Sequence, residues 1–131
     1  MSTTHVLVTT APDCRAAAAE LPPQKSRPTR ANIEYDLLAA APYALDHRGF
    51  THAVHRAMAE VSGKPALDFD AFHAKGQPCM RASPLTKRYG WAAHYDAEGK
   101  LALIDPASPA FAALSQDPAL PKTPAMRSKR G

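Results

Sequence analysis

Strand-like alternation of apolar and other side chains occurs in three short parts of the chain. Residues 5–10 are rich in β-branched side chains and end shortly before Pro12, which is typical of a strand. Residues 91–96 and 100–104 alternate as well, and Gly99 closes the turn between them. Because glycine adopts the positive φ that such turns need, the pattern predicts a β-hairpin here.

Helical spacing of apolar residues occurs in two longer segments. The first predicted helix covers residues 30–41, with Thr29 as its N-cap. The second covers residues 50–62 and is ended by a Gly-Lys-Pro run. Shorter helices are expected over residues 67–74 and after Ser108, which precedes a proline. Residues 76–86 are expected to be irregular because they contain two prolines.

These elements predict a small α+β fold. An antiparallel sheet that includes the 91–104 hairpin is expected to be flanked by two or three helices. The length of 131 residues fits one domain over residues 1–131, with a Pro-rich basic C-terminal segment at 118–131. Although 45% of the residues are apolar, 27 of them are alanines, so the core is expected to be modest.

Basic residues are unevenly distributed along this chain of net charge +4. Three windows without any acidic residue, 21–33, 71–95 and 118–131, hold 11 of the 16 basic residues. If the windows converge in the fold, they form a surface that attracts anions. If they scatter, they are solvated loops.

A cytoplasmic location with reduced thiols is expected. The chain begins without the pattern of a signal peptide and has no apolar run of membrane-spanning length. Two cysteines do not make a disulfide framework. No membrane association is expected, and the sequence indicates no oligomeric state.

The window 71–95 contains the candidate binding residues. Basic side chains can bind phosphate, and a neighbouring aromatic ring can stack on a base. The candidates for binding an anionic ligand, either a nucleotide or a nucleic acid, are Lys75, Arg81, Lys87, Arg88, Tyr89 and Trp91. Neither of the common glycine-rich phosphate-binding motifs is present. The competing interpretation is that the two aromatic rings belong to the core and the cations are solvated.

Cys79 and His94 are candidates for thiol chemistry. A cysteine nucleophile needs a nearby base or cation that favours the thiolate, and His94 could serve as the base. Strand alternation places Trp91 and His94 on opposite faces of the hairpin. The competing interpretation is a structural cysteine and an unrelated histidine on the sheet.

Three histidines, His47, His52 and His55, are candidate metal ligands. His52 and His55 are one helical turn apart, but His52 is opposite the apolar stripe of its helix and no cysteine is near. The sequence therefore predicts no metal site and no cofactor.

The chain resembles a known family in several places. The resemblance is carried by the run from Lys75 to Trp91, by His94, by Asp96-Ala-Glu-Gly-Lys100 and by Ala125-Met-Arg-Ser-Lys-Arg130. The family consists of short, mainly bacterial proteins and is known only as a domain of unknown function, family 6157. It implies no activity. It does imply one shared site or structural unit that contains Cys79, Arg81, Lys87, Arg88, Trp91 and His94.

Three functions compete on this evidence. The leading hypothesis is a small basic protein that binds an anionic ligand through residues 75–91. The first alternative is a thiol-dependent enzyme that uses Cys79 with His94. The second is a module that binds a protein partner through its Pro-rich edges.

Overall fold

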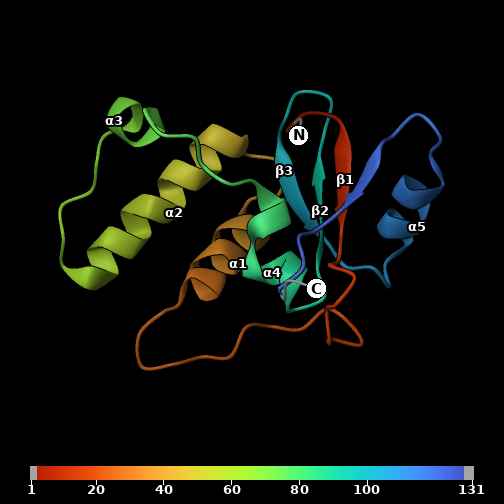
Figure 1. The fold of residues 1–131 in the computed structure, drawn as a ribbon, viewed down its shortest axis with the longest axis horizontal. Helices are drawn as coiled ribbons and strands as arrows, with labels where there is room; N and C mark the ends of the chain where they lie inside the picture. The colour runs from red at the N-terminus through yellow and green to blue at the C-terminus, as the bar shows by residue number, and fades with distance from the viewer. Residues whose placement is uncertain (1–2, 129–131) are drawn as a thin grey trace.

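The computed structural model describes residues 3–128 as a four-stranded sheet with helices on both faces (Figure 1). The α+β fold class is therefore confirmed. The elements follow in this order: β1 (Val6–Thr9), α1 (Arg30–Ala40), α2 (His47–Ser62), α3 (Phe69–His73), the 3₁₀ helix η1 (Met80–Ala82), α4 (Pro84–Lys87), β2 (Ala92–Tyr95), β3 (Leu101–Ile104), α5 (Pro109–Gln116) and β4 (Lys122–Pro124). No helix among residues 3–128 has the length and apolar character needed to cross a membrane.

The two faces of the sheet bury different apolar groups. Val8, Ala93 and Tyr95 belong to the larger cluster, on the face that α1 and α4 cover, and α2 packs on α1. Leu7 and Ala92 belong to a smaller cluster under α5 on the opposite face. Neighbouring residues of one strand therefore belong to different cores, as the period of two in a strand requires.

The sheet is mixed, so the prediction of an antiparallel sheet is wrong in this respect. The strand order is β3-β2-β1-β4, and β4 pairs with β1 in parallel, with Val8 opposite Thr123. The chain passes through α5 to the other edge of the sheet before it enters β4. Pro121 precedes this short strand and Pro124 ends it, and both disfavour a strand in the sequence. An edge strand tolerates proline because one side needs no ladder hydrogen bond.

The helices begin at residues whose side chains cap them. Thr29 caps α1 by accepting from the backbone N–H of Asn32, as predicted. α2 begins at His47 rather than at the predicted Phe50, because the Asp46 carboxylate accepts from the Gly49 N–H at 2.8 Å. This extra turn carries His47 towards the interior of the protein.

The segment expected to be irregular contains two short helices. Ser83 caps α4 by accepting from the Leu85 N–H at 3.1 Å, and Pro84 occupies the first helical turn. The same Ser-Pro signal starts α5 at Ser108. The prolines of this segment therefore mark a helix start as well as an irregular stretch.

Gly90 lets two backbone segments approach each other closely. Its φ is +79°, and a Cβ added there would lie 2.5 Å from the Ala18 carbonyl oxygen. Gly63 has a similar φ of +67°, but a Cβ there would have no heavy atom within 4 Å. Both positions therefore favour glycine because of their positive φ. Only at Gly90 would a side chain also collide with another part of the backbone.

We predict that Gly90→Ala destabilises the protein more than Gly63→Ala. The positive φ costs about 1–2 kcal/mol at either position, and the forced separation of backbone segments adds roughly 1–3 kcal/mol at Gly90. Chemical denaturation of both variants measures the difference. Equal losses of the free energy of unfolding would contradict the close packing of residues 16–20 against Gly90.

Candidate functional site

Residues 79–91 are held in place by hydrogen bonds to distant parts of the chain. The buried hydroxyl of Tyr95 in β2 accepts from the Met80 N–H at 3.0 Å. The Thr86 hydroxyl, fully buried, donates to the Met80 carbonyl at 2.5 Å, and the Thr86 carbonyl accepts from the Ala11 N–H. The segment is thus fixed to the sheet and to the residues that follow β1.

Arg81 binds the C-terminal part of the chain. Its Nε donates to the Pro124 carbonyl at 2.8 Å, and its own carbonyl accepts from the Met126 N–H at 2.8 Å. The second and third basic windows therefore converge. Arg81 uses Nε for the protein's own backbone, while Lys129 and Arg130 of the predicted basic segment lie outside the described residues.

Tyr89 and Trp91 hold the long connector that precedes α1. The Tyr89 carbonyl accepts from the Glu20 N–H, and the Trp91 Nε1–H donates to the Glu20 carbonyl, both at 2.8 Å. Both rings pack partly buried against the larger core, and the Trp91 ring lies 5.6 Å from that of Tyr35. The rings therefore serve the packing of the protein itself.

The structure does not bring Cys79 and His94 together. Cys79 packs against the same core as Tyr95. His94 precedes Tyr95 in β2 and so faces the other side of the sheet, where its Nδ1 lies 2.9 Å from the Tyr43 hydroxyl. The sheet therefore lies between the Cys79 thiol and the His94 ring. This arrangement gives no support to the hypothesis that His94 acts as the base for Cys79.

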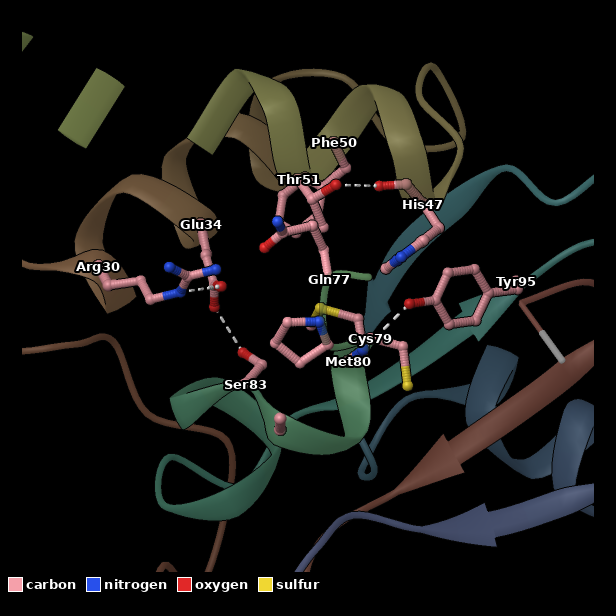
Figure 2. A pocket seen from close by; sticks show the side chains of 12 residues that line it. Arg30, Glu34, His47, Phe50, Thr51, Gln77, Cys79, Met80, Ser83 and Tyr95 are labelled. Carbon is pink, nitrogen blue, oxygen red and sulfur yellow. Dashed lines mark hydrogen bonds and ion pairs between the residues drawn. The ribbon is translucent and has the colours of Figure 1, made fainter. Parts of the chain in front are cut away.

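A polar cavity of about 110 Å³ lies between the helices and residues 77–83. Figure 2 shows His47, Tyr95 and Cys79 towards one end and Arg30, Glu34 and Ser83 towards the other. The cavity joins α1, α2, β2 and the segment around Cys79.

Glu34 is a buried acid at the wall of the polar cavity. Only 3% of the residue is exposed, and its carboxylate accepts from the Ser83 hydroxyl at 2.5 Å and from Arg30 Nε at 3.1 Å. Burial raises the pKa of Glu34, while Ser83 and Arg30 oppose this shift. Because the Arg30 side chain is 48% exposed, solvent screens the ion pair and burial dominates.

His47 is the histidine that shares a cavity with Cys79. Burial lowers the pKa of His47, His73 contributes in the same direction, and the Gln77 backbone opposes. Its Nδ1 is buried and has no hydrogen-bond partner among residues 3–128. The imidazole is thus held in a surrounding that favours its neutral form.

A second hollow, the basic cleft, has a volume of about 490 Å³. It is lined by Asp13, Arg15, Lys87, Arg88 and Ser128. The Asp13 carboxylate accepts from the Ser128 N–H at 3.0 Å, so the one acid that lines the cleft among residues 3–128 is engaged with the backbone. Of the predicted ligand-binding residues, Lys87 and Arg88 line this cleft, whereas Lys75 does not.

Comparison with protein families identifies the chain. The model of a family described as "Family of unknown function (DUF6157)" matches residues 1–131, the whole chain. The protein belongs to this family. No curated protein and no solved structure matches it. The resemblance drawn from the sequence is confirmed, and it brings no activity to any residue.

Sequence reasoning missed Arg15 and Glu34, and it did not indicate that His47 lies beside Cys79. Arg15 lies outside the three acid-free windows, and Glu34 occupies a helix whose apolar stripe does not indicate a buried acid. His47 was grouped with His52 and His55 as a weak metal candidate. Among residues 3–128 no group of three or more His, Cys, Asp or Glu side chains could hold a metal ion.

We predict that Glu34→Gln becomes more stable relative to wild type as the pH rises above about 4.5. The raised pKa means that the folded state binds the Glu34 proton more tightly than the unfolded state does, so wild type loses stability through this window. Denaturation at several pH values measures the difference. Asp36→Asn, at an exposed position of the same helix, is the control and should show a smaller pH dependence. If Glu34→Gln instead became less stable relative to wild type as the pH rises, the raised pKa of Glu34 would be contradicted.

Proposed function

We propose that the protein binds a small phosphate-bearing ligand in the basic cleft, with Arg15, Lys87 and Arg88 as the phosphate contacts. The observation that carries the proposal is that these three cations line a single cleft. Charge-assisted hydrogen bonds to phosphate are among the stronger polar contacts in proteins. The cleft volume of about 490 Å³ falls in the range of small-molecule sites.

The backbone around the three cations is ordered before any ligand arrives. The Lys87 and Arg88 N–H groups donate to the carbonyls of Ser83 and Pro84 at 3.0 and 2.9 Å. The loop that carries Arg15 is tied to α4 because the Ala11 N–H donates to the Thr86 carbonyl. A preformed site loses less conformational entropy on binding, which favours affinity.

A small ligand fits these observations better than a nucleic acid. A nucleic acid needs basic side chains along an extended track, but Lys75 does not line the cleft and Arg81 donates to the Pro124 carbonyl. Tyr89 and Trp91 are partly buried and pack against the core, so their rings already serve the protein's own packing. The ligand therefore remains an anion, as the sequence predicts. Of the predicted contacts, Lys87 and Arg88 remain, and Arg15 joins them.

The two alternative functions have less support. Cys79 packs against the core on one face of the sheet and His94 bonds Tyr43 on the other, so the geometry gives the thiol–base pair no support. The exposed large apolar side chains belong to four separate segments of the chain and do not favour a docking surface. They are Leu21, Tyr43, Leu67, Phe69 and Met126.

Calorimetric titration with ATP and with inorganic pyrophosphate tests the proposal. We expect binding at about 50 mM salt that weakens at about 200 mM. Arg15→Gln and Arg88→Gln should each weaken it about tenfold, because each removes a charge-assisted hydrogen bond. Arg56→Gln removes an equal charge from an exposed position on α2, outside the basic cleft, and should have little effect.

Three outcomes would contradict the proposal. If neither ATP nor pyrophosphate binds at low salt, the cleft does not bind phosphate-bearing ligands. An equal loss in Arg56→Gln would show that net charge, not the cleft, attracts the ligand. Much tighter binding of a single-stranded oligonucleotide than of ATP, with a steep salt dependence, would indicate a nucleic-acid protein instead.

A further inference from the structure

Three histidine side chains join α2 to α3 and to the loop before it, which lie side by side (Figure 1). His52 Nε2 on α2 lies 2.9 Å from the Leu67 carbonyl oxygen, and His55 Nε2 lies 3.0 Å from the Leu67 backbone nitrogen. His73 Nε2 on α3 lies 2.8 Å from the Arg48 carbonyl oxygen of α2. Hydrogen bonds to histidine therefore hold both the loop and α3 against α2.

These three hydrogen bonds determine which nitrogen of each imidazole carries a proton. A carbonyl oxygen only accepts, so His52 and His73 donate from a protonated Nε2. The Leu67 N–H only donates, so His55 Nε2 accepts and the proton of this ring is on Nδ1. A charged imidazole carries a proton on both nitrogens and cannot accept. The contact with Leu67 therefore requires a neutral His55, whereas the other two hydrogen bonds survive protonation.

The α3 flap, residues 64–74, removes little apolar surface from water. No residue of α3 is buried, and Leu67 in the loop before it is 52% exposed. The Phe72 ring stacks on the His55 ring with centroids 4.5 Å apart, so one imidazole provides both a ring contact and a hydrogen bond. Because so little apolar area is buried, the docked flap is only weakly favoured, and the loss of one hydrogen bond shifts its equilibrium.

Protonation also gathers positive charge between α2 and the α3 flap. The His52 ring lies 6.2 Å from that of His55 and 6.4 Å from that of His73. Burial lowers the pKa of His47 most and His73 lowers it further, so His47 interacts with the same group. The Arg48 guanidinium lies over an α3 ring, 5.0 Å from its centroid. Each proton that these imidazoles take up is therefore repelled by its neighbours.

Acidic groups of the facing elements do not pair with these histidines. Among residues 3–128 no carboxylate forms an ion pair with an imidazole. The carboxylates of Asp46 and Asp68 accept from backbone N–H groups at the starts of α2 and α3, both at 2.8 Å. The other charged side chains of α2 and the α3 flap, and of the residue that follows the flap, are exposed, so solvent screens them. They are Arg56, Glu60, Lys64, Asp70 and Lys75.

We propose that the α3 flap is a pH-sensitive element, docked on α2 at about pH 7.5 and released as the pH falls to about 5.5. The docked flap needs a neutral His55, so the released form binds more protons and a falling pH favours it. A protonated His55 can still stack on Phe72, but this contact does not replace the acceptor that Leu67 loses. Gln77 Nε2 donates to the Phe72 carbonyl and lines the polar cavity, so release also removes a contact of the cavity wall.

The tautomers of the histidines provide a first test, which uses the unaltered protein. Long-range ¹H–¹⁵N correlation spectra at about pH 7.5 should show the His55 proton on Nδ1 and the protons of His52 and His73 on Nε2. A proton on Nε2 of His55 at this pH would overturn the proposal, because His55 could not then accept from Leu67.

Cleavage by thermolysin, which cuts before Leu and Phe, measures how much of the α3 flap is released. Rates at Leu67, Phe69 and Phe72 are compared between wild type and His55→Gln at about pH 7.5 and 5.5, so that the pH dependence of the protease cancels. Glutamine can accept from the Leu67 N–H and does not titrate. We expect the ratio of wild-type to variant rates to be about fivefold higher at the lower pH, the factor that the loss of one hydrogen bond gives.

Two controls distinguish release of the α3 flap from other effects of pH. His5→Gln removes an exposed histidine that contacts the Ala119 carbonyl and should keep the wild-type pH dependence. Cleavage before the buried Leu101 in β3 reports global unfolding, and its ratio should stay constant. The proposal fails if the flap ratio is the same at both pH values, if it rises only as much as the ratio at Leu101, or if His5→Gln removes the pH dependence.

Discussion

Buried polar groups must be hydrogen-bonded, and this requirement shapes the segment of residues 79–91. The segment has only two short helices of its own, so many of its backbone groups find partners elsewhere. The Met80 N–H donates to the Tyr95 hydroxyl, and the Thr86 carbonyl accepts from Ala11. Arg81 and Tyr89 bind the C-terminal and N-terminal parts of the chain in the same way. These contacts tie regions that are far apart in the sequence to one short segment.

Both candidate sites depend on this segment. Lys87 and Arg88 line the basic cleft, together with Arg15 from the loop that the Ala11–Thr86 hydrogen bond holds in place. Cys79 and Ser83 line the polar cavity beneath α1 and α2. The same hydrogen bonds therefore fix both the positively charged basic cleft and the polar cavity. The cavity contains the buried acid Glu34 and His47, whose lowered pKa favours the neutral imidazole.

The sequence predicted the parts of the fold that local patterns determine. The hairpin of β2 and β3, the Thr29 cap and the opposite orientations of Trp91 and His94 follow from strand and helix periodicity. Pairing of β4 with β1 could not be predicted, because it joins residues more than 100 positions apart and the strand contains proline. The buried Glu34 was missed because its polar partner, Ser83, is also distant in the sequence. Convergence of Arg15 with Lys87 and Arg88 likewise depends on tertiary contacts that no charge pattern reveals.

Binding of a phosphate-bearing ligand at Arg15, Lys87 and Arg88 is the function proposed for the basic cleft. It is tested most directly by following the backbone amide resonances of the ¹⁵N-labelled protein during titration with ATP. We expect saturable shifts for the amides of these three residues and of Ser128, while the amides of Glu34 and Thr51 in the polar cavity remain unchanged. Shifts confined to the cavity residues, or spread evenly over exposed lysines and arginines, would contradict it.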